Sequence, residues 1–255
     1  MIIFIIPAYN EEANIGTLLR NISSIMNKHF YEYNIIAVND GSKDKTQSII
    51  ESFQRIMPIN LINHETNKGV GQVFRSGFAK ALEIMNGKDD IIVTMEADNT
   101  SDINILNNMI DKVSDGYDLV LASCYAKGGG IENTTLFRLI LSRGANLFTR
   151  FLFKLRGINT LTSFYRAYDG DLIKRAFEAY DGKLIEQPGF ACMVELLIKL
   201  MKFNAQVAEV PMVLKCQMRR DNSKMKVSRT IFEHVMLTLK YGIFQRKRYI
   251  KNNFS

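Results

Sequence analysis

The chain has 255 residues, of which 47% are hydrophobic and 23% are charged. These proportions are those of a folded protein with a large core, so they exclude a disordered chain, a collagen-like repeat and a disulfide-stapled miniprotein. The 33 Lys and Arg residues outnumber the 26 Asp and Glu residues, for a net charge of +7, and this balance favours anionic partners such as nucleotides, phospholipid surfaces or nucleic acid.

The three cysteines and three histidines are scattered along the chain. Their spacing argues against a zinc site, a disulfide framework and a Ser-His-Asp triad, and it fits a reducing compartment. The apolar start of the chain is too short for a signal peptide, and no stretch approaches the roughly 18 apolar residues of a spanning helix. We therefore expect a soluble or peripheral protein.

Strands and helices alternate along the first 125 residues. The run Ile2–Ile6 ends at Pro7 and is typical of a strand buried on both faces. Asn10, Glu11 and Glu12 then supply a cap and first-turn acids for a helix. Further strands are predicted at Asn34–Val38, Ile59–Ile62, Ile91–Met95 and Leu119–Ala122, and helices at Asp44–Arg55, Gly71–Met85 and Ile103–Val113. This alternation predicts an α/β fold, a mostly parallel sheet with helices on both faces.

The alternation breaks after Tyr125, and we expect the second half to decorate the sheet. Its expected parts, in order, are a glycine hinge at Gly128–Gly130, an apolar and basic segment at Thr134–Arg156, a helix at Phe190–Met201, a strand at Gln206–Val213, a basic loop at Lys215–Arg229 and a last amphipathic helix at Thr230–Phe244.

Polar residues gather where the predicted strands end, which is where ligands bind in open parallel sheets. Asn10 and Asp44 could equally be helix caps rather than ligand-binding residues. Glu96 and Asp98 alternate on an extended segment, so their side chains point the same way and could hold one divalent cation. The alternative is that Asp98 caps the helix that begins after Ser101.

Two sets of motifs carry a resemblance to a known family. Those of the first half are similar to the motifs of family 2 glycosyltransferases with the Rossmann-like GT-A fold: Pro7-Ala8-Tyr9-Asn10-Glu11-Glu12, Asn39-Asp40-Gly41-Ser42-x-Asp44-x-Thr46, Asn67-Lys68-Gly69-x-Gly71 and Glu96-Ala97-Asp98. Those of the second half resemble the dolichyl-phosphate mannosyltransferase branch: Tyr125-x-Lys127-Gly128-Gly129-Gly130, Arg138-x3-Ser142-Arg143-Gly144-Ala145-Asn146, Thr162-Ser163-Phe164-Tyr165-Arg166-Ala167-Tyr168, Glu209-Val210-Pro211 and Ser223-Lys224-Met225.

The resemblance implies a division of the chain and a set of site residues. Residues 1–229 would form the catalytic domain, with a nucleotide-sugar half at 1–125 and an acceptor half at 126–229, before the amphipathic basic helix of 230–255. The residues implied to line the base and ribose are Pro7, Tyr9, Glu11 and Asp40, and those implied to hold Mg or Mn against the diphosphate are Glu96 and Asp98.

For the acceptor and the loop that closes over the donor, the resemblance implies further residues. Arg138 and Ser142 would bind the acceptor phosphate, and Arg219 or Arg220, with Lys224, would close over the donor pyrophosphate. Glu195 matches a glutamate near the family's acceptor side, although it could equally be a solvated first-turn acid.

Three positions depart from the family's pattern. Glu96 stands in place of an aspartate, Thr100 in place of a glutamine that assists the metal, and Cys124 in place of an acceptor-binding arginine.

The charge pattern fits a lipid-borne acceptor. Residues 133–168 contain no acidic residue but six basic ones among apolar side chains: Arg138, Arg143, Arg150, Lys154, Arg156 and Arg166. Such a surface suits anionic headgroups, and the alternative is a buried helix whose arginines snorkel or pair with acids elsewhere. The last helix could lie in the membrane interface, dock a membrane-anchoring partner or pack on the core of its own domain.

These features predict an inverting, metal-dependent transferase that moves a hexose from GDP-mannose or a UDP-sugar to a polyprenyl or dolichyl monophosphate. It would be peripheral on the inner, cytoplasmic face of the membrane. A monophosphate is largely dianionic at pH 7, so no general base is required. The alternatives are a family 2 enzyme that acts on a saccharide hydroxyl and a catalytically silent nucleotide-sugar-binding protein. No aromatic and basic module supports a nucleic-acid partner.

Overall fold

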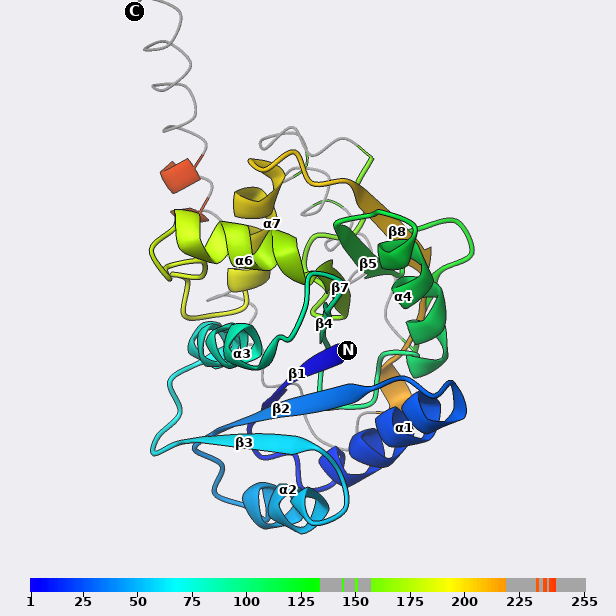
Figure 1. Cartoon of the computed structure of the whole chain (residues 1–255), viewed down its shortest axis with the longest axis vertical. Helices are drawn as coiled ribbons and strands as arrows, with labels where there is room; N and C mark the ends of the chain where they lie inside the picture. The colour runs from blue at the N-terminus through cyan, green and yellow to red at the C-terminus, as the bar shows by residue number, and fades with distance from the viewer. Residues whose placement is uncertain are drawn as a thin grey trace, which may run out of the picture.

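A seven-stranded sheet forms the centre of the molecule (Figure 1). The computed structural model describes residues 1–133, 144, 150, 157–218, 233, 236–237 and 239–241. The strands are β1 (Ile2–Ala8), β2 (Tyr33–Asp40), β3 (Ile59–His64), β4 (Ile91–Thr94), β5 (Leu119–Ser123), β6 (Gly130–Glu132), β7 (Arg166–Asp169), β8 (Val207–Pro211) and β9 (Val213–Lys215). The helices are α1 (Ile15–Lys28), α2 (Thr46–Gln54), α3 (Val70–Ile84), η1 (Ile103–Ile105), α4 (Leu106–Ser114), α6 (Gly170–Ala179), α7 (Cys192–Met201) and η2 (Cys216–Met218).

The strand order of the large sheet is β3-β2-β1-β4-β7-β5-β8. β7 runs antiparallel to both β4 and β5, and the other paired strands of this sheet are parallel. The expected mostly parallel α/β fold is thus confirmed. The expectation that the second half only decorates the sheet was wrong, because β7 and β8 complete it.

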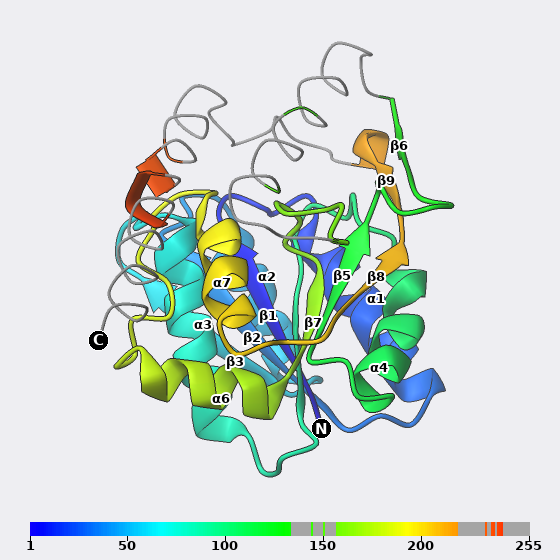
Figure 2. The same cartoon turned by 90° about the horizontal axis from the view of Figure 1, so that it is seen from above.

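Two hydrophobic cores lie on opposite faces of the sheet, because successive strand residues point to opposite sides. In β1, Ile3 and Ile5 belong to one core and Ile2, Phe4 and Ile6 to the other. The helices divide in the same way. α3, α6 and α7 cover the first face, and α1, α2 and α4 cover the second (Figures 1 and 2). The continuous apolar run of β1 is therefore buried on both faces, as its sequence predicts.

A second, two-stranded sheet lies beyond the carboxyl ends of β5 and β8 (Figure 2). The strand expected over Gln206–Val213 divides in two, since β8 ends at Pro211 and β9 pairs with β6. Met212 links the two sheets, because its N–H donates to the Ser123 carbonyl and its own carbonyl accepts from the Gly130 N–H. Both sheets therefore meet at the edge where a parallel fold binds its ligands.

Four described elements of the second half were not predicted: β6, β7, α6 and η2. β6 begins at Gly130, where a glycine hinge was expected, and η2 lies at the start of the expected basic loop. The helix expected over Phe190–Met201 is present as α7. The segment expected at Thr134–Arg156 lies outside the described residues except for positions 144 and 150. Within the described part of the chain, no helix is both long and apolar enough to cross a membrane.

Six described residues near the C-terminus are all helical, and we call them the C-terminal segment: Glu233, Met236, Leu237, Leu239, Lys240 and Tyr241. Leu237 and Tyr241 join the core that contains α3, α6 and α7. Met236 and Leu239 are about half exposed. The alternative in which the last helix packs on its own domain is confirmed for this buried face.

Candidate functional site

The loops that follow β1 and β2 are tied together by their own polar groups. The Asn10 N–H donates to Ser42 Oγ at 2.9 Å, and Asn10 Oδ1 accepts from the Lys43 N–H at 2.8 Å. The Glu11 N–H donates to Thr46 Oγ1 at 2.7 Å. Asn10 therefore joins two loops rather than capping α1. Tyr9 and Glu11, expected beside the nucleotide, lie on this joined surface at the carboxyl edge of the sheet.

Asp44 anchors the start of α2. Its Oδ1 accepts from both the N–H and the hydroxyl of Thr46, at 2.9 and 2.5 Å, and its Oδ2 accepts from the Glu12 N–H at 3.1 Å. Burial alone would raise the pKa of Asp44, but the hydrogen bonds from Thr46 and Glu12 outweigh it and lower the pKa below its ordinary value. Asp44 thus bonds the first N–H group of α2 from one residue before the N-cap position, which Lys45 occupies.

Asp40, the last residue of β2, is buried, and both of its carboxylate oxygens accept hydrogen bonds. Its Oδ1 lies 2.7 Å from His64 Nδ1 and accepts from the Lys68 N–H at 2.9 Å. Its Oδ2 accepts from the Gly69 N–H at 2.9 Å. The carboxylate thus holds the turn that leads into α3. Sequence reasoning missed His64, because only the pairing register of β2 and β3 places it opposite Asp40.

Glu96 and Asp98 follow β4 and lie close enough to interact electrostatically. Burial, together with the neighbouring Asp98 carboxylate, raises the pKa of Glu96 above its ordinary value. Asp98 is 8% exposed, and its Oδ1 accepts from the N–H and hydroxyl of Thr100, at 3.0 and 2.7 Å. The alternative role of Asp98 as a helix cap was wrong, because Asp102 is the residue whose side chain caps η1.

Both oxygens of Glu96 also contact protein groups. Oε2 accepts from the Ser101 hydroxyl at 3.0 Å, and Oε1 accepts from the Phe164 N–H at 3.1 Å. Thr94 donates its hydroxyl to the Phe164 carbonyl at 2.5 Å. The end of β4 therefore fixes the segment that enters β7.

The same segment is held from the other side by β8 and β5. Glu209 Oε1 accepts from the N–H groups of Asn159 and Thr160 at 2.7 and 2.8 Å. The Ser123 and Thr160 hydroxyls lie 2.6 Å apart. Residues 158–164, which precede β7, are thereby placed beside the carboxyl ends of β4, β5 and β8. The role of Glu209 was not predicted, although its motif was noted.

Glu195 lies in the first turn of α7 and is fully buried. Its Oε2 accepts from the N–H groups of Glu186 and Gln187, both at 2.8 Å. Its Oε1 lies 3.2 Å from Lys199 Nζ and accepts from the Tyr241 hydroxyl at 2.8 Å. The alternative of a solvated first-turn acid was therefore wrong, because three elements enclose this carboxylate.

Several expected site residues lie outside the described residues, so their roles stay predictions: Arg138, Ser142, Arg219, Arg220 and Lys224. Arg166 is one of the six basic residues expected on a surface that suits anionic headgroups, and for Arg166 that expectation was wrong. Its guanidinium is fully buried and donates to the carbonyls of Leu161, Ser163 and Met193 at 2.7 to 2.9 Å.

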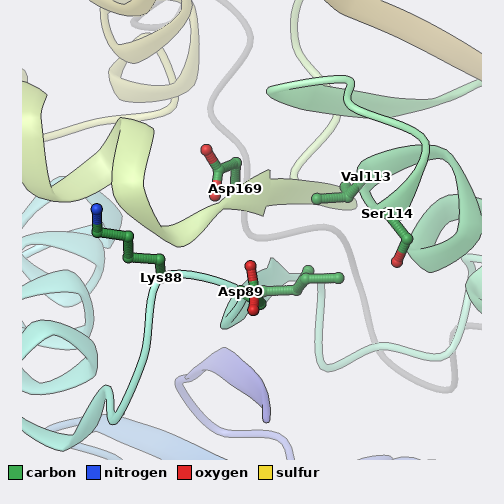
Figure 3. Close-up of a pocket in the computed structure, with 6 residues that line it drawn as sticks. Lys88, Asp89, Val113, Ser114 and Asp169 are labelled. Carbon is green, nitrogen blue, oxygen red and sulfur yellow. The ribbon is translucent and has the colours of Figure 1, made fainter.

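A cavity of about 240 Å³ lies at the opposite edge of the sheet (Figure 3). Lys88, Asp89 and Ile91 contribute from the start of β4, Ser114 from the end of α4 and Asp169 from the end of the antiparallel β7. It is therefore remote from the strand ends that carry Asp40 and Asp98.

Comparisons with known proteins identify a family for this chain, with its polar loops at the carboxyl edge of a mostly parallel sheet. Residues 3–177 match the model of the family described as Glycosyl transferase family 2. The chain belongs to this family.

Two curated relatives are each 30% identical to the chain. One is a dolichol-phosphate mannosyltransferase of Pyrococcus furiosus, over 232 residues that are 91% of this chain and 60% of the relative. The other is a polyprenol monophosphomannose synthase of Mycolicibacterium smegmatis, over 209 residues that are 81% of this chain and 74% of the relative. The chain thus spans 60% of the length of the Pyrococcus protein.

Solved structures share the fold at low sequence identity. Glucosyl-3-phosphoglycerate synthase from Mycobacterium tuberculosis, in complex with Mn²⁺, UDP and glucosyl-3-phosphoglycerate, has a TM-score of 0.64 and 18% identity, over 95% of this chain and 79% of that one. The same enzyme with Mg²⁺ and UDP has a TM-score of 0.63 and 18% identity, over 95% and 79%. These likenesses confirm the GT-A type of α/β fold.

Proposed function

We propose that the chain is an inverting glycosyltransferase that moves a hexose from a nucleotide sugar to a polyprenyl or dolichyl monophosphate. The two relatives support this acceptor class, because both are named for mannosyl transfer to such lipids and are 30% identical to the chain. The donor would be GDP-mannose or a UDP-sugar.

The donor would lie against the loops after β1 and β2. Pro7, Tyr9 and Glu11 would line the base and ribose, on a surface kept in shape by the bonds between Asn10 and the following loop. Asp40 would act on the donor through the turn it holds, since its oxygens already accept from Lys68, Gly69 and His64. This part of the site would be rigid before the donor binds.

The neighbouring carboxylates of Glu96 and Asp98 are the observation that carries the proposal. Burial, and then the neighbouring Asp98 carboxylate, raise the pKa of Glu96, and a divalent cation would relieve the repulsion between the two carboxylates. Their oxygen donors suit Mg²⁺ or Mn²⁺. When bound, the metal would neutralise charge on the departing nucleoside diphosphate. Crystals of the structurally similar synthase contain Mn²⁺ or Mg²⁺ with UDP.

The acceptor phosphate would be its own nucleophile. Arg138 and Ser142, four residues apart, would grip it, and Arg219 or Arg220 with Lys224 would cover the donor pyrophosphate. A single direct displacement inverts the anomeric centre. The segment 158–164, fixed by Glu96 and Glu209, would form the floor between the donor and acceptor sides.

The protein would act as a peripheral protein on the inner, cytoplasmic face of the membrane. The half-exposed Met236 and Leu239 of the C-terminal segment would add apolar contact with the lipid or with a membrane-anchoring protein.

A catalytically silent nucleotide-sugar-binding protein is the second candidate. It is favoured by one observation, the bonding of both Glu96 oxygens to Ser101 and Phe164, which reduces their availability to a metal. Action on a saccharide hydroxyl would additionally need a general base directed at the acceptor.

The deciding experiment is a panel of GDP- and UDP-sugars with short polyprenyl phosphates and Mg²⁺ or Mn²⁺, scored by radiolabelled lipid. We expect the wild type to transfer the sugar to the lipid phosphate. Both the Asp98→Asn substitution and removal of the metal by a chelator should abolish this transfer. Asp102→Asn is the matched control, because asparagine caps η1 as well as aspartate does. Transfer to soluble sugars alone would contradict the proposal that the acceptor is a lipid phosphate. Inactivity of both the wild type and Glu96→Asp would favour the catalytically silent nucleotide-sugar-binding protein.

A further inference from the structure

Two loops from opposite halves of the chain meet at the start of α3. The Gly71 N–H donates to the Pro188 carbonyl at 2.9 Å. The contact is so close that a Cβ on Gly71 would lie 1.8 Å from the Gln187 carbonyl oxygen, and one on Gly69 would lie 2.7 Å from that of Pro188. The turn held by Asp40 is therefore pressed against residues 186–189, which we call the bracing loop.

The bracing loop is itself held by a buried carboxylate. Glu195 accepts from the N–H groups of Glu186 and Gln187, the two residues before Pro188. Lys199 adds a second tie, since its Nζ donates to Glu186 Oε2 at 3.1 Å and to the Lys183 carbonyl at 2.7 Å. The position of the loop thus depends on where Glu195 lies.

The C-terminal segment closes over this arrangement. The Tyr241 hydroxyl donates to Glu195 Oε1 at 2.8 Å. Burial beside Glu195 raises the pKa of Tyr241, so the phenol keeps the proton it donates. Glu233 lies against Gly189, where an added Cβ would meet its carboxylate oxygens at 2.1 and 2.2 Å. Two residues eight apart in one segment therefore contact the bracing loop and its anchor.

We propose that Tyr241 and Glu195 are positioning residues for the donor site: the docked C-terminal segment fixes the bracing loop, and the loop fixes the Lys68–Gly71 turn against which the donor binds. The inference deepens the proposed function and rests on it for the identity of the ligand. It assigns the C-terminal segment a part in donor binding, in addition to any contact with lipid. It follows that loss of the contacts made by the C-terminal segment should lower the affinity for the donor, although no residue of the segment contacts the donor itself.

The test removes one hydrogen bond from the full chain. Tyr241→Phe keeps the ring and deletes the hydroxyl, and Tyr117→Phe, at a partly exposed tyrosine in the α4–β5 loop, is the matched control. We expect titration calorimetry with GDP and with UDP, each with Mg²⁺, to show binding weakened by up to about fivefold in Tyr241→Phe and unchanged in the control. Fivefold is the limit reached when the free energy of one hydrogen bond of average strength is passed in full to the donor site. In turnover assays, the KM for the donor should rise while the KM for the lipid phosphate stays constant.

Amide hydrogen exchange provides a readout that needs no ligand. In Tyr241→Phe, the amides of Glu186 and Gln187 and those of Lys68, Gly69 and Gly71 should all exchange faster. In the wild type, the amides of the bracing loop and those of the Lys68–Gly71 turn should show the same protection factor, because we expect them to open together. This measurement tests the coupling even if the variant does not fold. Faster exchange confined to the bracing loop, with nucleotide affinity unchanged, would overturn the inference. A wild type that binds neither nucleotide would instead overturn the proposed function, while the exchange data still decide the coupling.

Discussion

Asp40 and Glu195 perform the same structural task in different halves of the molecule. Each carboxylate is buried, and each accepts from the N–H groups of two consecutive residues. Asp40 is completed by His64, at the end of the neighbouring strand, whereas Glu195 is completed by Lys199 and by Tyr241, 46 residues away. The first clamp is built within one supersecondary unit, and the second requires the chain beyond β9.

This difference matters because the two clamps hold loops that press on each other. The turn fixed by Asp40 and the bracing loop fixed by Glu195 meet at Gly71. The nucleotide-sugar half of the chain is therefore not structurally independent, since its donor-side turn is supported by residues more than one hundred positions further along. Changes at the contact should have larger effects than changes at either clamp.

The largest effect is expected for Gly71→Ala, at the contact itself. Alanine is favoured over glycine in a helix by about 1 kcal/mol, but here its Cβ would lie 1.8 Å from a backbone oxygen, so one of the two loops must move. We expect a loss of about 4 kcal/mol in the free energy of unfolding, measured by urea denaturation. Gly87→Ala, where no atom lies within 4 Å of the added Cβ, should change it by less than about 1 kcal/mol. Equal effects at the two positions would show that the loops do not need their close approach.

A smaller effect is expected when each clamp loses its charge. In Asp40→Asn, the new amide group must face an N–H group, whichever way it turns, because both oxygens accept from backbone donors. In Glu195→Gln, the remaining oxygen can keep both loop N–H groups while the amide faces the Tyr241 oxygen, and Lys199 retains Glu186.

We therefore expect urea denaturation to give a loss of about 3 kcal/mol for Asp40→Asn and about 2 kcal/mol for Glu195→Gln. Exposed Asp111→Asn is a control for the acid-to-amide change. A larger loss for Glu195→Gln would mean that the charge balance around Lys199, rather than hydrogen-bond satisfaction, governs the second clamp.

The first clamp could be anticipated from the sequence, because strand ends in a parallel sheet converge on one edge. The motif that contains Asp40 and the pair of Glu96 and Asp98 were located in this way. What the motifs did not indicate is that His64 binds Asp40, since this depends on the register that places His64 opposite it. Register across two strands follows from packing and is not written in either strand alone.

The second clamp was beyond sequence reasoning for a related reason. A glutamate in the first turn of a helix is normally solvated, and only the approach of Tyr241 and the bracing loop buries Glu195. β7 was missed because a four-residue strand within an aromatic run has no clear period. Its insertion between β4 and β5 also explains why Arg166, which the sequence analysis placed among surface basic residues, lies in the core.

The smallest expected effect concerns the rate at which two cysteines are labelled. Cys124 follows β5, and Cys192 begins α7, the helix that carries Glu195. Burial raises the pKa of Cys124 to about 11, so its labelling by iodoacetamide at pH 8 should be slow and should rise about tenfold per pH unit up to pH 10.

Burial, with smaller contributions from Glu195 and Glu233, also raises the pKa of Cys192, whose side chain is fully enclosed. Peptide mass spectrometry should therefore find Cys192 labelled only when α7 opens, and sooner in Tyr241→Phe than in Tyr117→Phe. Labelling of Cys192 at equal rates in these two variants would show that the second clamp does not depend on the C-terminal segment, and would make the two clamps more alike than their partners suggest.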